Sequence, residues 1–385
     1  MNTSKFKKMV LTGKPEFTKR RQGLCQALSQ HYQSVEIINN TSEWYEQKPL
    51  TLILKLFYAL CVFSLGKADC LLHKNQQAFM MRSLNIERQI RQLKYSPDIV
   101  FHIFSMSSPF WENFDIPFAI YLDYTMALSE KHWQDWAFFL NSKERDAWIE
   151  CESKTYERAC HIFVMSNIVK NSLIQDYGIN SQKITVVGAS VNFHQNKINP
   201  KKKTFGSKKL LFNSSDFRRK GGDIVIKAFI KVKKMIPDAK LVVIGKKLNP
   251  LTISHIDGVE NIGQISSPEK MELLFSETDL VIAPARCEPF GIFLLDAMKN
   301  GVPCVITAGN GNGMPEFLED WIDGIIIPEL DPELIANTII KLLSNPNQLS
   351  LMSEAGIYKM QTKFNWDNIA KEIVDVLENS ACLEK

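Results

Sequence analysis

Two carboxylates eight positions apart, Glu288 and Asp296, flank a tight turn in the segment EPFGIFLLD. Between them, Pro289 stiffens the turn, and Gly291 lets the backbone approach a ligand closely because it has no Cβ. The amides from Gly291 to Leu294 open an apolar helix, and the positive end of a helix attracts phosphate. Carboxylates accept hydrogen bonds from paired hydroxyls, which sugars offer. The pattern predicts a site for a ligand with a sugar on each side of a diphosphate.

A second loop supplies cations. In SDFRRKGGD, Arg218, Arg219 and Lys220 follow an apolar strand and precede two glycines and a helix. Cations on such a loop suit a diphosphate, because they can neutralise the charge of a leaving group without a metal. Each segment also has a purely structural interpretation, with Glu288 capping its helix, Asp296 solvated and the basic turn solvated. The presence of both loops in one domain favours the binding site.

Alternating strands and helices must position these loops. In the second half, apolar runs such as KLLFN, KLVVI, LVIA and CVIT alternate with helical stretches, and KMVLTG, SVEIIN, FAIYL and HIFV do so in the first half. Strands without polar alternation predict a parallel sheet covered on both faces, the doubly wound α/β class. We predict two Rossmann-like domains, residues 1–195 and 206–364, joined by the Lys-rich stretch from His194 to Lys209. The expected ligand site lies in a cleft between them, beyond the carboxyl ends of the strands.

Cysteine usage and apolar runs bear on location. The eight cysteines are scattered without a CxxC pair, which indicates a reducing compartment, no structural zinc and a cytoplasmic protein. The basic start lacks an apolar core of signal-peptide length. The longest apolar run, Leu50 to Gly66, contains Lys55 and is shorter than the roughly 20 residues of a spanning helix. It predicts a buried or surface-docked helix.

The net charge of +4 is unevenly shared. Residues 1–205 hold 26 Lys and Arg against 18 Asp and Glu, and residues 206–385 hold 20 against 24, so the halves carry about +8 and −4. A basic first half indicates an anionic partner such as a phospholipid surface or a phosphorylated substrate, although solvated lysines give the same imbalance. We therefore expect peripheral attachment to a membrane or a lipid-linked acceptor, and no nucleic-acid partner.

Three segments resemble the retaining glycosyltransferases of family 4, which have the GT-B fold of two Rossmann-like domains. EPFGIFLLDAMKNGVPCVIT is similar to the family's Glu, seven residues, Glu pattern and its Gly-x-Pro-Val. DFRRKGGDIVIKAF is similar to its phosphate loop, and YERACHIFVMSNIVKNSLIQDYGINSQKITVVGASVN to the segment that closes its first domain. The similarity runs from about Tyr156 to Leu377 and is faint over residues 1–150. It implies a C-terminal helix, about 365–385 with Asn365 as N-cap, that packs back on the first domain.

The resemblance also implies roles. Glu288 would contact the donor sugar, and Asp296 would contact the ribose of the nucleotide. Lys220 with Arg219 would hold the diphosphate. The backbone at Gly263 and Gln264 would lie beside the nucleotide base. Gly13 would lie in a loop that approaches the donor phosphates. The predicted catalytic residues are Glu288, Lys220, Arg219 and Asp123, and the predicted donor-binding residues are Gly13, Arg218, Gly263, Gln264, Glu288, Pro289, Phe290, Gly291, Ile292, Phe293 and Asp296.

Some positions depart from the family pattern. Asp296 is one methylene shorter than the usual second Glu, and Ser215 stands where many members have Arg, so that Arg219 or Arg218 would substitute. The first loop has no Gly-Gly pair. No His follows the fourth strand, where Asp123 is the nearest polar candidate, unless Asp123 is an ordinary strand-end residue.

The sequence has no Asp-x-Asp pair, so no metal or other cofactor is expected. The function that these features indicate is a retaining transfer of a sugar from a nucleotide-diphosphate sugar to a hydroxyl of a glycan, glycolipid or small molecule. The alternatives are a nucleotide-sugar binding protein without transferase activity, and a GT-B phosphorylase or epimerase.

Overall fold

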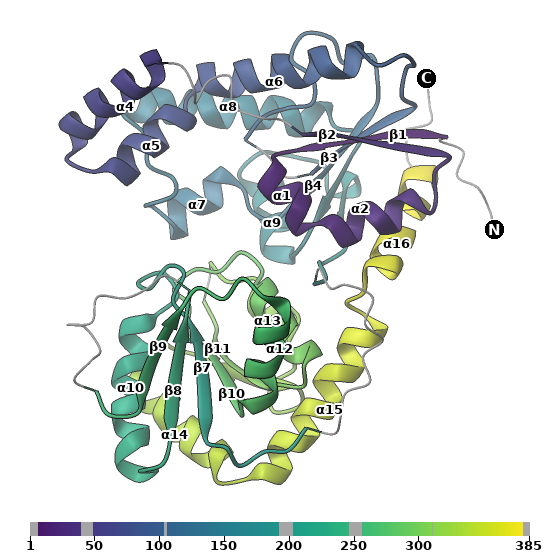
Figure 1. Cartoon of the computed structure of the whole chain (residues 1–385). Coiled ribbons are helices and arrows are strands. Elements are labelled where there is room, and N and C mark those ends of the chain that lie inside the picture. The colour runs from purple at the N-terminus through teal and green to yellow at the C-terminus, as the bar shows by residue number, and fades with distance from the viewer. Residues whose placement is uncertain are drawn as a thin grey trace. The chain divides into compact units, whose positions relative to one another are not determined.

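The computed structural model describes residues 7–39, 49–103, 106–191, 203–245, 256–309 and 311–379. The chain divides into two compact units, one made of residues 1–192 with 366–385 and the other of residues 193–365 (Figure 1). Of the predicted domain boundaries, residue 195 lies outside the described ranges and residue 206 lies within them. Most of the predicted linker from His194 to Lys209 also lies outside them.

The first unit holds a six-stranded parallel sheet with the order β2-β1-β3-β4-β5-β6. Its central strands β3 and β4 are buried along their whole length, as their unbroken apolar runs predict. The strands are β1 Lys8–Gly13, β2 Ser34–Asn39, β3 Ile99–Ile103, β4 Phe118–Leu122, β5 His161–Val164 and β6 Ile184–Val186.

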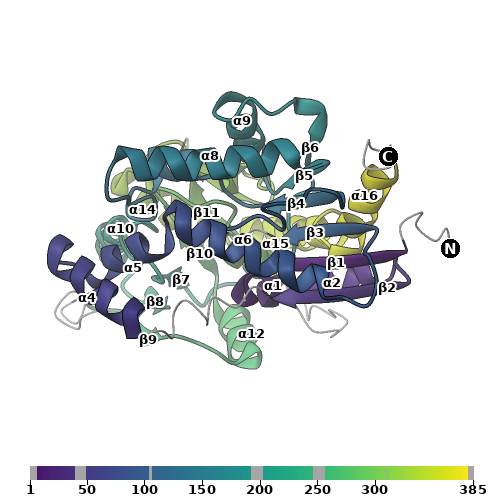
Figure 2. The ribbon, with the colours of Figure 1, turned by 90° about the horizontal axis from the view of Figure 1, so that it is seen from above.

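Helices cover both faces of this sheet. Figure 1 shows α6 and α8 on one face and α1 and α2 on the other, and α6 and α8 pack side by side (Figure 2). The helices are α1 Pro15–Arg20, α2 Gln22–Ser29, α4 Pro49–Val62, α5 Leu65–His73, α6 Gln76–Arg91, α7 Met126–His132, α8 Ser142–Arg158, α9 Asn167–Gln175 and α16 Trp366–Asn379, with a 3-10 turn at Ser181–Lys183.

The second unit repeats the plan with the order β12-β11-β10-β7-β8-β9, again all parallel. On one face α10 packs against α14, and α13 packs against α15. The strands are β7 Lys209–Asn213, β8 Lys240–Ile244, β9 Val259–Gly263, β10 Leu280–Ala283, β11 Cys304–Thr307 and β12 Gly324–Ile327, and the helices are α10 Gly222–Met235, α12 Pro268–Glu277, α13 Ile292–Lys299, α14 Pro332–Leu343 and α15 Pro346–Thr362, with a 3-10 turn at Met314–Glu316.

The predicted class of two doubly wound parallel sheets is confirmed. The sequence did not predict β9, whose segment VENIG alternates exposed and less exposed residues, as expected of a strand at the edge of a sheet.

The last helix belongs to the first unit. Helix α16 packs against α2, and the indole Nε1 of Trp366 donates to the Val191 carbonyl at 3.0 Å. Gly23 on α2 allows this approach, because a Cβ there would lie 2.2 Å from the Trp366 ring. Asn365 precedes the helix, and its side-chain amide donates back to the Gln361 carbonyl at 3.0 Å.

Cysteine chemistry differs from the expectation in one place. Cys160 is disulfide-bonded, which the scattered spacing of the cysteines did not predict. The cytoplasmic location therefore stays a prediction. Among the described residues, no helix combines the length and the apolar character needed to cross a bilayer. The described cysteines that are free are Cys25, Cys61, Cys70, Cys151, Cys287 and Cys304.

Candidate functional site

Two loops lie against each other at the carboxyl edge of the second sheet. One joins β7 to α10 and the other joins β10 to α13, and β7 and β10 are neighbours in the sheet. The Arg286 amide donates to the Arg219 carbonyl at 2.8 Å. The Arg286 guanidinium donates to the Arg218 carbonyl at 2.6 Å and to the Asp223 carboxylate at 2.7 Å. These bonds hold the loop that carries Lys220 beside the loop that carries Glu288.

The carboxylate of Glu288 meets two cations there. Its Oε2 lies 2.9 Å from Nζ of Lys220 and 3.2 Å from a guanidinium nitrogen of Arg219. All three side chains are largely buried, between 13% and 17% exposed. Burial by itself raises the pKa of Glu288, but the charges of Lys220 and Arg219 outweigh it and hold the pKa below its usual value. Glu288 is therefore ionised at neutral pH, and Lys220, Arg219 and Glu288 together carry a charge of +1 that the Asp216 carboxylate beside Arg219 balances.

Arg219 is held by more than its ion pair with Glu288. Its Nε lies 3.0 Å from the Asp216 carboxylate, and its guanidinium donates to the Cys287 carbonyl at 2.6 Å. These contacts fix the guanidinium on the loop that carries Glu288. Arg218, by contrast, has an exposed side chain, so that only its carbonyl contributes to the junction of the two loops.

Gly221 makes the close packing of the basic loop possible. It adopts the left-handed conformation, with φ of 75°, at the N-cap of α10. A Cβ at this position would lie 2.0 Å from the Pro284 carbonyl oxygen, a distance that no side chain tolerates. The glycine therefore lets the loop lie directly on the end of β10, which brings Lys220 to Glu288.

The N-terminus of α13 lies next to this cluster. Gly291 caps the helix with φ of 88° and has no side chain. The amide of Leu294, which the sequence predicted to point outward, donates instead to the Gly291 carbonyl at 2.8 Å. The amides of Gly291, Ile292 and Phe293 have no acceptor within the described part of the chain. Three amides, and not four, are thus available to an anion.

Asp296 lies a turn and a half into the same helix. Its Oδ1 is buried and has no hydrogen-bond partner among the described residues. Burial raises the pKa of Asp296 to about 7, although the Lys299 charge acts in the opposite direction. A buried carboxylate oxygen without a donor is unfavourable, and a hydroxyl from a ligand would satisfy it.

A small pocket joins these residues. Its polar lining comes from Asn213, Lys220 and Glu288, with the backbone of Gly291 and the ring of Phe293 beside them. The interior space is about 20 Å³, which is enough for one water and too little for a sugar. A sugar would therefore lie over the mouth of the pocket in this conformation. The apolar lining residues are Phe212, Ile282, Ala283, Ala285, Leu294 and Met314.

The remaining donor-binding predictions differ in their surroundings. Phe290 is buried and packs against Phe317, with ring centroids 5.3 Å apart, so that its ring belongs to the core, whereas Pro289 is half-buried. Gly263 ends the edge strand β9 with φ of 74°, and Gln264 follows with an exposed side chain. These two stand at the same carboxyl edge as Glu288, on the far side of β7 and β8.

Gly13 and Asp123 belong to the first unit. Gly13 ends β1, and a Cβ there would lie 2.6 Å from the Ile103 carbonyl oxygen. Close packing against β3 therefore explains a glycine at this position without any ligand. Asp123 follows β4 and is half-buried. Both stand at the carboxyl edge of the first sheet.

Three polar residues near these sites were not predicted from the sequence. Asp216 supports Arg219, and an acid three residues before an arginine was the available signal. Asn312, set between glycines, donates to the Ala285 carbonyl at 2.8 Å and bridges to the backbone of Glu288. In the first unit, Nε2 of His102 donates to the Ser107 carbonyl, so that Nδ1 accepts from the Thr12 hydroxyl at 2.7 Å. Burial lowers the pKa of His102 to about 4, and the imidazole is neutral.

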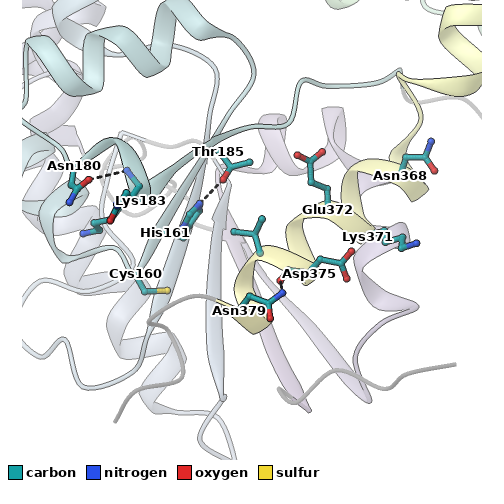
Figure 3. Close-up of a pocket in the computed structure, with 12 residues that line it drawn as sticks. Cys160, His161, Asn180, Lys183, Thr185, Asn368, Lys371, Glu372, Asp375 and Asn379 are labelled. Atoms are coloured by element: carbon teal, nitrogen blue, oxygen red, sulfur yellow. Dashed lines mark hydrogen bonds between the residues drawn. The ribbon is translucent and has the colours of Figure 1, made fainter.

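A larger groove of about 740 Å³ lies in the first unit between the edge of its sheet and α16 (Figure 3). None of the predicted site residues lines it. Its charged lining holds two lysines, Lys183 and Lys371, and two carboxylates, Glu372 and Asp375. Its charges therefore select neither an anion nor a cation.

Comparison with known proteins agrees with this geometry. Residues 194–359 match the family model of glycosyl transferases group 1. An uncharacterized glycosyltransferase of Methanocaldococcus jannaschii is 26% identical over 242 residues, which are 58% of this chain and 60% of that protein. The GDP-mannose-dependent monoacylated alpha-(1-6)-phosphatidylinositol monomannoside mannosyltransferase of Corynebacterium glutamicum is 26% identical over 178 residues, 43% of this chain and 46% of that protein. The chain thus covers less than two thirds of either relative.

The whole chain resembles solved structures in fold. Sucrose-phosphate synthase of Thermosynechococcus elongatus superposes with a TM-score of 0.67 over 97% of this chain and 98% of its own, at 15% identity. The chain has the GT-B fold.

Proposed function

We propose that this protein transfers a sugar from a nucleotide-diphosphate sugar to a hydroxyl acceptor, with retention of configuration at the anomeric carbon and without a metal ion. The observation that supports this proposal most directly is the contact of Lys220 and Arg219 with Glu288 at the pocket. Glu288 and Asp216 balance these two cations, and the exposed Arg218 on the same loop adds a positive charge that a diphosphate would neutralise.

Each residue has a distinct part in this proposal. Lys220 and Arg219 would stabilise the charge that develops on the departing diphosphate, and the amides of Ile292 and Phe293 would bind its oxygens. Glu288 would accept hydrogen bonds from the donor sugar. Because Glu288 also pairs with both cations, it holds them at the site before the donor arrives.

The nucleoside would lie along α13. Asp296 has a buried oxygen without a partner, and a ribose hydroxyl would satisfy it. Gly263 and Gln264, at the same edge of the sheet, would face the base. Retention of configuration rests on the resemblance of the Glu288 to Asp296 motif to the family pattern.

The acceptor would bind at the first unit, where Gly13 ends β1 and Asp123 follows β4, on either side of β3 in the sheet. The Corynebacterium relative is named for a phosphatidylinositol monomannoside acceptor. We therefore propose that the acceptor hydroxyl belongs to a glycolipid or another lipid-linked head group. This acceptor class should be tested first.

The test is a transfer assay with GDP-, UDP- and ADP-sugars, each with and without a phosphatidylinositol glycolipid or myo-inositol, in the presence of EDTA. We expect release of nucleoside diphosphate that depends on the acceptor, and a product whose anomeric proton coupling by NMR equals that of the donor. Binding without turnover would contradict the transferase, activity lost to EDTA would contradict metal independence, and an inverted product would contradict retention.

A further inference from the structure

Helix α4 presents an exposed face that consists of large apolar side chains. Leu52, Ile53, Leu56, Phe57 and Leu60 recur at helical spacing, and the turn into α5 continues the face with Phe63 and Leu65. These seven side chains, the α4 face, are between 58% and 93% exposed. Single exposed apolar residues are ordinary, but a contiguous patch of this kind on a protein surface marks an interaction site.

The surroundings of α4 explain why the face is uncovered. The helix packs against α5, and the two helices lie together at the edge of the first unit (Figures 1 and 2). α5 in turn contacts the segment 133–140, where Lys67 lies 4.8 Å from the Phe138 ring centroid. A helix that is apolar on all sides is normally buried in a protein core or in a membrane. In α4 the side toward α5 is covered, whereas the α4 face is exposed.

The charges around the face are mainly positive. Lys55, the one charged residue of α4, pairs with Asp69 at 2.5 Å. Residues 49–74 hold three lysines and one aspartate, but Lys74 is buried and donates to the Trp136 carbonyl, so the hairpin's surface charge is about +1. Lys67 is exposed two residues after Leu65, at the border of the face. An apolar face with an exposed cation at its border fits a surface that is apolar inside and anionic outside.

We propose that the α4 face docks the protein on an anionic phospholipid bilayer, with α4 lying in the boundary between head groups and acyl chains. At about 1.5 Å per residue a helix of this length is roughly 21 Å long, shorter than the roughly 30 Å hydrocarbon core. It therefore lies in the interface and does not cross the bilayer.

The composition of the face favours lipid over a protein partner. Protein interfaces combine an apolar centre with a polar rim and about one hydrogen bond per 100–200 Å². The seven side chains of the α4 face hold no donor or acceptor. Lipid tails require none, and Lys67 at its border would meet the head groups. The proposal does not depend on the site at Glu288, because docking needs no sugar donor.

The test uses the full chain and flotation with vesicles of phosphatidylcholine alone or mixed with phosphatidylglycerol. We expect the protein to float with the mixed vesicles and less with the neutral ones. Phe57→Asp combined with Leu60→Asp should weaken partitioning at least about tenfold, because two apolar anchors are lost. Lys67→Glu should lower the preference for anionic vesicles about fivefold or more. Leu351→Asp, on α15 with 62% exposure like Leu56, is the matched control and should bind as the parent does.

Three results would overturn the proposal. One is equal and negligible flotation with both vesicles. The second is flotation of the double variant at the parent's level while its thermal unfolding shows an intact fold. The third is a dimer in sedimentation that Phe57→Asp converts to a monomer without any change in vesicle binding, since the α4 face would then be an interface between two copies of the chain.

Discussion

The ammonium of Lys220 lies 2.9 Å from Oε2 of Glu288, although the two are 68 positions apart in the chain. The neighbouring strands β7 and β10 carry the two loops to one edge of the sheet, and Gly221 lets them pack directly. The contact joins the residue proposed to hold the diphosphate to the one proposed to bind the sugar.

Replacing Lys220 by Ala should slow transfer while leaving the fold intact. The loss of one preorganised charge that stabilises the departing diphosphate costs about 2–4 kcal/mol, or roughly 30- to 1000-fold in kcat/KM. Steady-state kinetics in EDTA would measure it. Lys227→Ala, an exposed lysine on α10, is the control and should retain the parent's rate. A Lys220→Ala enzyme with normal kcat/KM would exclude the proposed role.

Glu288→Gln should lower both stability and turnover. The variant leaves Lys220 and Arg219 close together with only Asp216 to balance them, so we expect the melting temperature to fall by several degrees. The loss of a charged hydrogen bond to the donor costs about 1.5–3 kcal/mol, or roughly ten- to a hundredfold in rate. A nucleoside diphosphate should restore the melting temperature, because it supplies the missing negative charge. A variant that melts lower but turns over normally would show that the carboxylate is structural only.

Asp296 should make stability depend on pH. Its pKa is about 7 in the folded protein against an ordinary 3.8. The folded state therefore holds a proton that the unfolded chain has lost, and this contribution is complete below about pH 4 and disappears as the pH rises through 7. The Asn side chain of Asp296→Asn cannot ionise. The melting temperature of this variant should therefore rise relative to that of the parent as the pH increases from 5 to 8. Thermal unfolding across this range tests it, and parallel profiles would contradict the burial of the carboxylate.

The same residue should affect the nucleotide more than the chemistry. We expect Asp296→Asn to weaken nucleoside diphosphate binding about tenfold, because the amide accepts through one oxygen only and without charge. Asp296→Glu, the residue usual in the family that the motif resembles, should bind as well as the parent or better. Calorimetric titration of both variants measures this. Equal affinity of parent and Asp296→Asn would place the ribose elsewhere.

Gly221 and Gly263 provide a matched pair of glycines. Their φ angles are 75° and 74°, but a Cβ at Gly221 would clash with the Pro284 carbonyl, whereas one at Gly263 would meet open space. Gly263→Ala should cost about 1 kcal/mol of unfolding free energy from backbone strain alone. Gly221→Ala should cost at least about 2 kcal/mol more, since the loop must move off β10. Denaturant unfolding compares them, and equal losses would exclude the clash.

The sequence predicted the strands well because most of them are buried on both faces, as in β3, β4 and β11, and such strands have unbroken apolar runs. β9 was missed because Glu260 and Asn261 interrupt the run at an exposed edge. Local patterns also placed Glu288 and Lys220 at the ends of strands. Their contact could not be predicted, because it depends on the order of strands in the sheet and on the packing of two loops.

The side-chain environments were the least predictable part of the site. Phe290 stands between Glu288 and Gly291 in the motif, yet its ring packs into the core against Phe317. Asn312 positions its loop through a bond to the Ala285 carbonyl that no spacing rule indicates, whereas the i, i+3 spacing of Asp216 and Arg219 was a signal that could have been used. From the sequence, Asp296 could be either solvated or in contact with a ligand. The burial of its Oδ1 excludes a fully solvated carboxylate.

The most direct test of the proposed donor site compares nucleoside diphosphates with nucleoside monophosphates by calorimetry. For whichever of GDP, UDP and ADP binds the parent most tightly, the ratio of the monophosphate Kd to the diphosphate Kd measures what the cations add for the second phosphate. We predict that Lys220→Ala reduces this ratio about tenfold, the size of one charged hydrogen bond, while Lys227→Ala leaves it unchanged. A ratio that Lys220→Ala does not alter would contradict the assignment of Lys220 to the diphosphate of a sugar donor.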